Sequence, residues 1–160
     1  MQASITECSV TRTATALMAN APLPQLDRVV ETALYCDDLS RSRAFYVDTL
    51  GCEPLLDSAR LVAVSVGGVS VLLLFQRGAT SEPLATAGGV VPPHGGTGIQ
   101  HVAFAVADRS QLDAWRARFE QRSVAIESRV RWPRGGESVY VRDPDGHSIE
   151  LITPGLWAIY

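Results

Sequence analysis

Two similar stretches of this 160-residue chain decide its fold: residues 29–45 read VVETALYCDDLSRSRAF, and residues 99–115 read IQHVAFAVADRSQLDAW. A shift of 70 positions places Glu31 on His101. Each stretch begins with alternating apolar residues, which is typical of a half-buried strand, and then reaches an aspartate suited to cap a helix. The chain therefore contains an internal repeat, and each copy begins with a strand followed by a helix.

The later part of each copy repeats as well. Residues 61–75 break at a pair of glycines, and residues 138–152 break at Asp-Pro-Asp-Gly, so both suit a tight turn between two strands. Shorter stretches near residues 53–56 and 124–128 supply one more strand to each copy. The predicted fold class is therefore α+β, with two βαβββ modules paired into a curved eight-stranded cup.

The predicted domain organisation is a disordered N-terminal lead, residues 1–26, followed by one domain over residues 27–160. Its modules span residues 27–76 and 98–155, and a linker rich in glycine and proline joins them. A composition of 46% hydrophobic and 19% charged residues excludes a disordered charged chain.

The composition also bounds the partners and the chemistry. The net charge of −3 argues against nucleic acid, and no apolar run reaches the roughly 18–20 residues of a membrane helix. All 14 basic residues are arginines, so lysine chemistry such as a Schiff base is absent. Three cysteines fit neither a disulfide framework nor a zinc site, and we expect a cytoplasmic protein with reduced thiols.

Three ionisable residues lie inside predicted strands, where an unpaired charge is costly. Glu31 and His101 occupy equivalent positions, and Glu150 lies in the last strand. Strand alternation places all three on the open face, and the pseudo-twofold axis is expected to bring Glu31 and His101 together. One histidine and two carboxylates form a ligand set for a divalent metal. In the alternatives, His101 is a hydrogen-bonded core residue, and Glu31 is a general base or the partner of an arginine.

Further side chains are candidates for binding a substrate. They are aromatic or polar residues placed near the predicted mouth of the cup: Tyr35, Gln76, Arg77, Trp132 and Tyr140. Arginines in the run 129–134 are able to hold a carboxylate or phosphate, although a solvated loop is the more ordinary interpretation. His94, in the linker, either closes over a pocket or is solvated, and the solvated interpretation is favoured. His147 is expected to belong to its turn.

Three stretches, taken in order with the repeat, resemble the vicinal-oxygen-chelate superfamily, which contains glyoxalase I, extradiol dioxygenases and bleomycin- or fosfomycin-resistance proteins. They are VETALYCDDLSRSRAFYVDTLG (30–51), GIQHVAFAVAD (98–108) and VRDPDGHSIELITPG (141–155). The resemblance covers about residues 28–155. It implies paired βαβββ modules that form a cup around a divalent metal, with ligands on the first and last strands of each module.

The ligand positions implied by the resemblance are Glu31, Leu72 (Leu73 if the register slips), His101 and Glu150. A leucine cannot bind metal, so one histidine and two carboxylates are left. Extradiol dioxygenases keep the same three positions but use two histidines and one carboxylate, so Glu31 departs from their pattern. The amide oxygen of Gln76 is a further candidate for the lost position.

Several functions stay open. The first is a metal-dependent enzyme on a small oxygen-rich substrate, with Glu31 or Glu150 as ligand or proton carrier. Iron favours dioxygenase ring cleavage, whereas Zn, Ni, Mn or Co favours glyoxalase, lyase or isomerase chemistry. The alternatives are a non-catalytic resistance-type protein that binds a drug or antibiotic, and a structural dimer or inactive remnant. A homodimer is expected because exposed sheet edges are usually covered by association.

Overall fold

The computed structural model describes residues 23–160, so most of the lead predicted for residues 1–26 lies outside the described residues. Residues 23–30 precede the first strand and have no regular secondary structure. Within the described part, no helix combines the length and the apolar character needed to cross a membrane.

Each module contains the elements that the repeat predicts. The first comprises β1 (Glu31–Cys36), α2 (Leu39–Ala44), the π-helical turn η1 (Phe45–Thr49), β2 (Glu53–Asp57), β3 (Leu61–Val66) and β4 (Ser70–Gln76). The second comprises β7 (His101–Ala105), α3 (Arg109–Gln121), β8 (Ile126–Arg131), β9 (Glu137–Arg142) and β10 (Ser148–Ile152). The linker, expected to be irregular, contains a short hairpin of β5 (Leu84–Thr86) and β6 (Gly89–Val91).

The two modules have the same strand order. One sheet runs β1-β4-β3-β2 and the other β7-β10-β9-β8, and in each the first strand is parallel to the last. The α+β fold of paired βαβββ modules is thus confirmed. Among the described strands, the expected eight are arranged as two four-stranded sheets, with no ladder of hydrogen bonds between β1 and β7.

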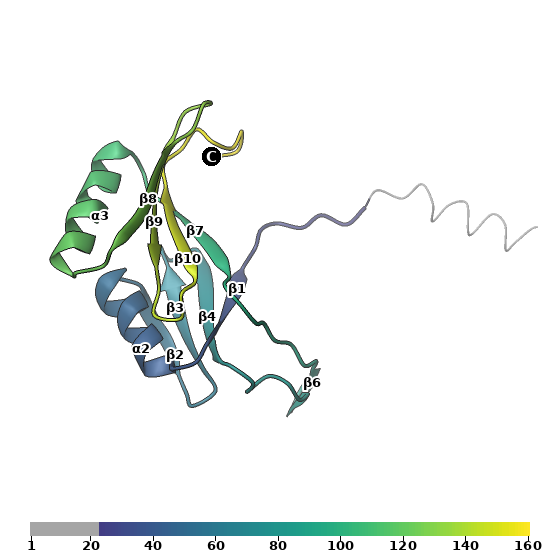
Figure 1. Ribbon diagram of the computed structural model, residues 1–160. Coiled ribbons are helices and arrows are strands. Elements are labelled where there is room, and N and C mark those ends of the chain that lie inside the picture. The colour runs from purple at the N-terminus through teal and green to yellow at the C-terminus, as the bar shows by residue number, and fades with distance from the viewer. Residues whose placement is uncertain (1–22) are drawn as a thin grey trace, which may run out of the picture.

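The helices begin where the capping aspartates predict. The carboxylate of Asp38 accepts the backbone N–H of Arg41 at 3.0 Å, and Asp108 accepts that of Gln111 at 2.9 Å. Such bonds satisfy backbone donors that the first helical turn leaves unpaired. In Figure 1 both helices lie on the same side of the sheets, and the opposite face is open.

One continuous hydrophobic core lies between the sheets and the helices. Alternation along the last strand of each module explains why both strands contribute to this core. The side chains that point to the helix side are at most 2% exposed: Leu72 and Leu74 in β4, and Ile149 and Leu151 in β10. Leu72 therefore cannot be the position equivalent to Glu150 on the open face. The parallel registers assign that position to Leu73, which lies opposite Ala33 as Glu150 lies opposite Ala103.

A turn of the second module ties the two modules together. His147 belongs to this turn, as the sequence predicts, and is fully buried. Its Nδ1 atom accepts the backbone N–H of Gln100 at 3.0 Å, and its Nε2 atom lies 3.1 Å from the carbonyl oxygen of Tyr35. Asp145, in the same turn, accepts the N–H of Asp37 and the hydroxyl of Ser42, both at 2.7 Å. The modules are thus joined by the polar contacts of this turn as well as by the shared core.

Candidate active site

His101 and Glu150 form the polar centre of the open face in the second module. His101 begins β7 and Glu150 lies in the neighbouring parallel strand β10. The His101 Nε2 atom lies 3.3 Å from the Glu150 Oε2 atom. The imidazole side chain is 52% exposed, whereas the carboxylate side chain is only 7% exposed. The pair therefore combines a half-exposed imidazole with a buried carboxylate on the open face.

The other carboxylate oxygen of Glu150, Oε1, accepts a hydrogen bond from the neighbouring strand β9. The hydroxyl of Ser138, in β9, donates to Glu150 Oε1 at 2.5 Å. The Ser138 Oγ atom in turn accepts the indole N–H of Trp132 at 2.7 Å. Trp132 thus orients the Ser138 hydroxyl, and this hydroxyl in turn positions the carboxylate of Glu150. A serine at this place gave no signal of its own in the sequence, although strand alternation puts it on the face that Tyr140 shares.

Tyr140 lies beside both members of the pair. It is directly opposite Glu150 in the antiparallel register of β9 and β10, and its ring stacks on that of His101 at a centroid distance of 6.3 Å. Burial, together with a hydrogen bond to Glu150, raises the pKa of Tyr140 to about 12. Its phenol therefore keeps its proton at neutral pH and is a hydrogen-bond donor at this site.

The donor chemistry of the pair fits a divalent cation. The His101 Nδ1 atom lies 3.1 Å from the carbonyl oxygen of Ser148, so Nδ1 carries the proton in this bond. In the neutral imidazole with its proton on Nδ1, the Nε2 lone pair faces an oxygen of Glu150, and a cation placed between these two electron-pair donors would bind to both. A carbonyl that orients the ligating imidazole through its other nitrogen is a common feature of metal sites.

The pair does not gain a third ligand within the described residues, which contain no group of three or more His, Cys, Asp or Glu able to hold a metal ion. Glu31 begins β1 and is exposed, and among residues 23–160 its side chain has no ion pair or hydrogen bond. It lines a cavity of about 370 Å³ with residues of the β3–β4 turn and of β7, among them Val66, Val69 and Ala103. Of the described residues that line this cavity, Glu31 alone is charged.

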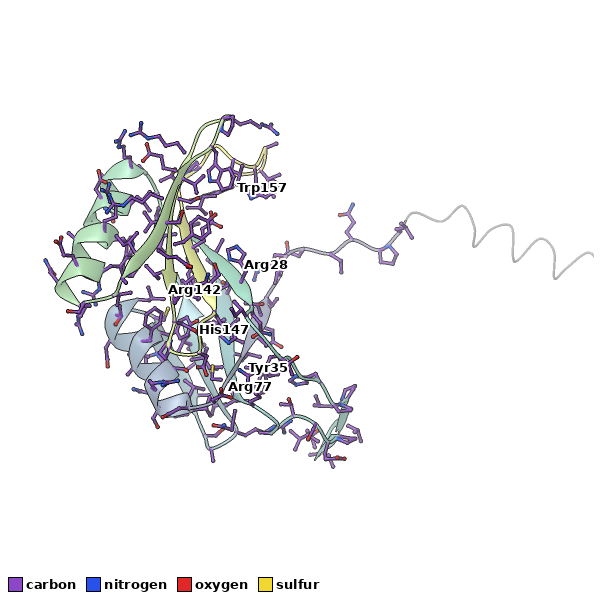
Figure 2. The ribbon with its side chains drawn as sticks, viewed as in Figure 1. Arg28, Tyr35, Arg77, Arg142, His147 and Trp157 are labelled. Carbon is purple, nitrogen blue, oxygen red and sulfur yellow. The ribbon has the colours of Figure 1, made fainter. Side chains whose placement is uncertain are left out.

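The remaining candidates in the first module have structural contacts of their own. The hydroxyl of Tyr35 lies 2.7 Å from His94 Nδ1, and its ring stacks on Phe75. Arg77 binds the carboxylate of Asp37 at 2.6 Å and donates to the carbonyl of Tyr35 at 2.8 Å. Figure 2 shows Tyr35 and Arg77 close together near the linker. These contacts hold the linker against the end of β1.

One sequence expectation is corrected in this region, and one candidate residue has a structural contact of its own. His94, expected to be solvated, is half-buried and packs edge-on against Phe75 at a centroid distance of 4.8 Å. Gln76, a candidate for the lost ligand position, donates its amide N–H to the carbonyl of Asp37 at 3.1 Å. It follows Leu73 by three residues and lies at the last position of β4.

Residues of the run 129–134 point to two different faces of the sheet. Trp132 points to the open face, where it reaches Ser138. Arg129 pairs across the sheet with Val139, a core residue 2% exposed, and therefore lies on the helix side. Arg131 lies opposite Glu137 and binds its carboxylate at 3.2 Å. These two arginines thus do not line the mouth of the cup.

Comparison with known proteins agrees with this architecture. The family described as the Glyoxalase/Bleomycin resistance protein/Dioxygenase superfamily matches residues 26–151. This match covers most of the chain, so the protein belongs to that superfamily. A crystal structure of lactoylglutathione lyase from Agrobacterium tumefaciens is 39% identical, with a TM-score of 0.77, over 84% of this chain and 99% of that one.

Two characterised relatives are similar in sequence. The chain is 31% identical to catechol-2,3-dioxygenase from Bacillus subtilis over 113 residues, which are 71% of this chain and 36% of that protein. It is 28% identical to metallothiol transferase FosB from Staphylococcus saprophyticus, over 72% of this chain and 70% of that protein. The chain thus spans about a third of the dioxygenase relative and most of the transferase.

Proposed function

We propose that the protein is a divalent-metal-dependent enzyme acting on a small oxygen-rich substrate, with His101 and Glu150 as two of the metal ligands. The observation that carries this proposal is the 3.3 Å approach of His101 Nε2 to the buried carboxylate of Glu150, while the Ser148 carbonyl engages Nδ1. A bound metal supplies Lewis acidity to a substrate oxygen.

The surrounding side chains have distinct parts in the proposed site. Ser138 and Trp132 fix one oxygen of Glu150, so the carboxylate presents its other oxygen toward His101. Tyr140 keeps its phenolic proton and is placed to donate a hydrogen bond to Glu150 or to a substrate oxygen that carries developing charge. The half-exposed imidazole leaves the centre accessible to a small molecule.

Glu31 is proposed as the third ligand, contributed by a second copy of the chain. The described residues of one chain do not group it with His101 and Glu150, and it is exposed beside an open cavity. In the proposed dimer, two copies pair through their open faces, and the exposed Glu31 of one lies beside His101 and Glu150 of the other. A metal shared in this way makes the homodimer part of the active site.

Among the possible reactions, we favour glyoxalase-type lyase or isomerase chemistry. The supporting observation is the 39% identity to a lactoylglutathione lyase that this chain covers almost completely, whereas it covers 36% of the dioxygenase relative. Ring-cleaving dioxygenase chemistry is the second candidate within the same site. The metal separates them, because bound iron favours oxygen chemistry and Zn, Ni, Mn or Co favours the lyase or isomerase.

The first test is metal content by ICP-MS on freshly purified, tag-free protein. About one equivalent of a divalent transition metal per chain is expected in the wild type. His101→Ala and Glu150→Gln should each lose most of it, whereas Glu53→Gln, an exposed carboxylate on β2, should not. Equal metal content in all four proteins contradicts the site.

A mixing experiment tests whether Glu31 acts across the dimer. Glu31→Gln and the double variant His101→Ala/Glu150→Gln are each expected to bind little metal alone. After joint refolding, a mixed dimer combines the intact pair of one chain with the intact Glu31 of the other, so metal binding should partly return. If all three ligands belonged to one chain, mixing would restore nothing.

A ligand-binding protein without catalysis is the alternative that one observation favours. The cavity of about 370 Å³ beside Glu31 is lined mainly by apolar residues, with this single carboxylate among them. Such a lining suits an apolar or cationic small molecule. Near-zero metal content that no added divalent ion restores, together with saturable binding of a cationic dye lost in Glu31→Gln, would support this alternative.

A further inference from the structure

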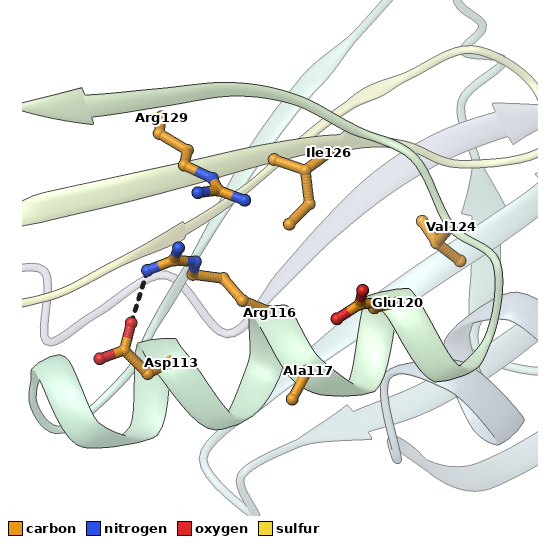
Figure 3. Close-up of a pocket in the computed structure, with 7 residues that line it drawn as sticks. All are labelled: Asp113, Arg116, Ala117, Glu120, Val124, Ile126 and Arg129. Carbon is orange, nitrogen blue, oxygen red and sulfur yellow. Dashed lines mark hydrogen bonds and ion pairs between the residues drawn. The ribbon is translucent and has the colours of Figure 1, made fainter.

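A groove on the helix side of the second sheet collects arginines that the proposed active site does not use. It is a cavity of about 510 Å³ between α3 and β8, shown in Figure 3 and lined by Asp113, Arg116, Ala117, Glu120, Val124, Ile126 and Arg129. A second cavity of about 310 Å³ continues it, shares Arg116 and Arg129, and adds Arg109 and Arg131. Four guanidinium groups therefore line one continuous groove.

Backbone geometry brings these side chains together. Arg109 and Arg116 lie on one face of α3, with Asp113 and Glu120 at the helical spacings of three and four residues. Arg129 reaches the same groove from β8, because its cross-strand partner Val139 points into the core beneath α3. The groove is thus built from rigid elements rather than from a loop.

The positive charge in the groove is only partly neutralised. Arg116 binds Asp113 at 2.6 Å, while Arg131 and Arg109 share the single carboxylate of Glu137 at 3.2 and 3.4 Å. Arg129 has no ion pair among residues 23–160. Figure 3 shows the guanidinium groups of Arg116 and Arg129 facing each other across the groove. Two like charges in this arrangement repel unless an anion lies between them.

We propose that this groove binds the phosphate group of a small phosphorylated metabolite, held between Arg116 and Arg129. Planar guanidinium groups match phosphate oxygens with paired hydrogen bonds. Beyond the arginines, Val124 and Ile126 offer an apolar wall, and the carboxylate of Glu120 is an acceptor for a hydroxyl. The ligand is therefore a phosphate monoester of a small alcohol, and the combined volume suits a small molecule rather than a polymer.

The phosphate position between Arg116 and Arg129 lies on the other side of the sheet from the proposed metal centre, and of the two cavities only the second is also lined by Ser138. Arg129 shares the helix side of β8 and β9 with Val139, whereas Ser138 and Tyr140, the neighbours of Glu150, point to the open face. Phosphate binding is thus expected to survive His101→Ala. The two proposals can fail independently, since one is measured by metal content and the other by phosphate affinity.

Isothermal titration calorimetry with glycerol 3-phosphate, and with inorganic phosphate as a second probe, tests the proposal on the full chain. Arg129→Gln is expected to weaken binding about tenfold, which corresponds to about 1.4 kcal/mol for the loss of a charged hydrogen-bond donor. Arg122→Gln is the matched control, because Arg122 is an exposed arginine at the end of α3 that does not line the groove. It should change affinity less than twofold.

Asp113→Asn gives a prediction of opposite sign. Removing the carboxylate that occupies Arg116 is expected to strengthen phosphate binding several-fold, whereas Glu82→Gln, which removes an acid from the linker, should have little effect. Equal affinities in Arg129→Gln and Arg122→Gln would overturn the proposal, as would the absence of saturable binding at millimolar phosphate. Tighter binding of a short oligonucleotide, lost in Arg129→Gln, would assign the groove to nucleic acid instead and also overturn it. Thermal unfolding of each variant checks that the fold is retained.

Discussion

The two modules have the same backbone and different chemistry. In the first, the parallel register places Glu31 opposite Val71, and two residues further along β4 is Leu73. In the second, His101 lies opposite Ser148, and two residues further along β10 is Glu150. The open face thus carries a carboxylate and a leucine in one copy, and an imidazole and a carboxylate in the other.

The next strand extends the difference. Leu73 is paired with Ala63 of β3, whereas Glu150 is paired with Tyr140 of β9. In the first module this position thus faces an apolar cross-strand partner, whereas in the second the carboxylate lies beside the hydroxyl groups of Ser138 and Tyr140. The repeated fold thus supplies equivalent positions, while a few side chains decide which copy contains a cluster of polar groups.

Placing a glutamate in β4 of the first module is the strongest way to break this comparison. Leu72→Glu puts a carboxylate into the core, where Leu72 is fully buried, and should cost more than about 4 kcal/mol and prevent folding. Leu73→Glu changes the half-buried neighbour on the open face and should leave the protein folded. Circular dichroism and urea denaturation measure the difference.

Leu73→Glu has a second expected outcome, which rests on the proposed metal site. The new carboxylate shares the open face with Glu31, as Glu150 shares it with His101. Metal affinity should rise about tenfold, because a fourth ligand is added. Leu73→Gln is the uncharged control. If both variants unfold as Leu72→Glu does, the register assignment is incorrect.

Truncating an equivalent core residue in each module tests whether the two modules contribute alike to stability. Leu72 and Ile149 occupy equivalent positions, and both are fully buried in the same hydrophobic cluster. Leu72→Ala and Ile149→Ala should each lower the free energy of unfolding by about 2–5 kcal/mol. A single cooperative transition in both variants is expected in denaturant titration, because one core joins the modules. Two separate transitions would show that the modules unfold independently.

Much of this fold was predictable from the sequence because its signals are local. The alternation before His101, the aspartates that cap both helices and the turn at Gly67 and Gly68 all specify their elements through nearby residues. Both turn glycines have positive φ values, 60° and 71°, a conformation that favours glycine. The internal repeat then predicted the second module from the first.

The site was predictable only where strand pairing carries the information. His101 and Glu150 meet because their strands are neighbours in one sheet, and strand alternation already predicts that both lie on the open face. The distance between Glu31 and His101 depends on how the two sheets, or two copies of the chain, are placed relative to each other. The alternation of residues along a strand contains no information about this placement. The contacts of Tyr35 and His94 depend in the same way on how the linker folds back, so His94 was assigned to solvent wrongly.

Acid should weaken the contact between the modules at Asp145. Burial opposes the charged form of this carboxyl, but hydrogen bonds from Asp37 N–H and the Ser42 hydroxyl, with the charge of Arg41, outweigh it and lower the pKa of Asp145. A lowered folded-state pKa means that the charged form stabilises the fold. This stabilisation is complete above the unfolded-state pKa of about 3.9 and is lost as the pH falls through the folded-state pKa.

The measurement is urea denaturation of wild type and Asp145→Asn between neutral pH and acid. The variant should be less stable than the wild type at neutral pH, and the difference should shrink as the pH falls. Asp48→Asn, at an exposed aspartate of η1, is the control and should follow the wild type. A gap between Asp145→Asn and wild type that is unchanged at low pH would argue that shape, and not charge, matters at this turn.

The smallest expected effect concerns the helix caps that both modules share. Asp38 caps the six-residue α2, which continues into a π-helical turn, and its carboxylate accepts the N–H of Arg41. Asp38→Ala should lower the free energy of unfolding by about 0.5–2 kcal/mol, while Asp38→Asn keeps an acceptor and should lose much less. The cap also fixes where the chain leaves β1, so amide hydrogen exchange of the α2 backbone should accelerate in Asp38→Ala more than that of α3. Equal acceleration in both helices would mean that the modules loosen together, because their common core outweighs local capping.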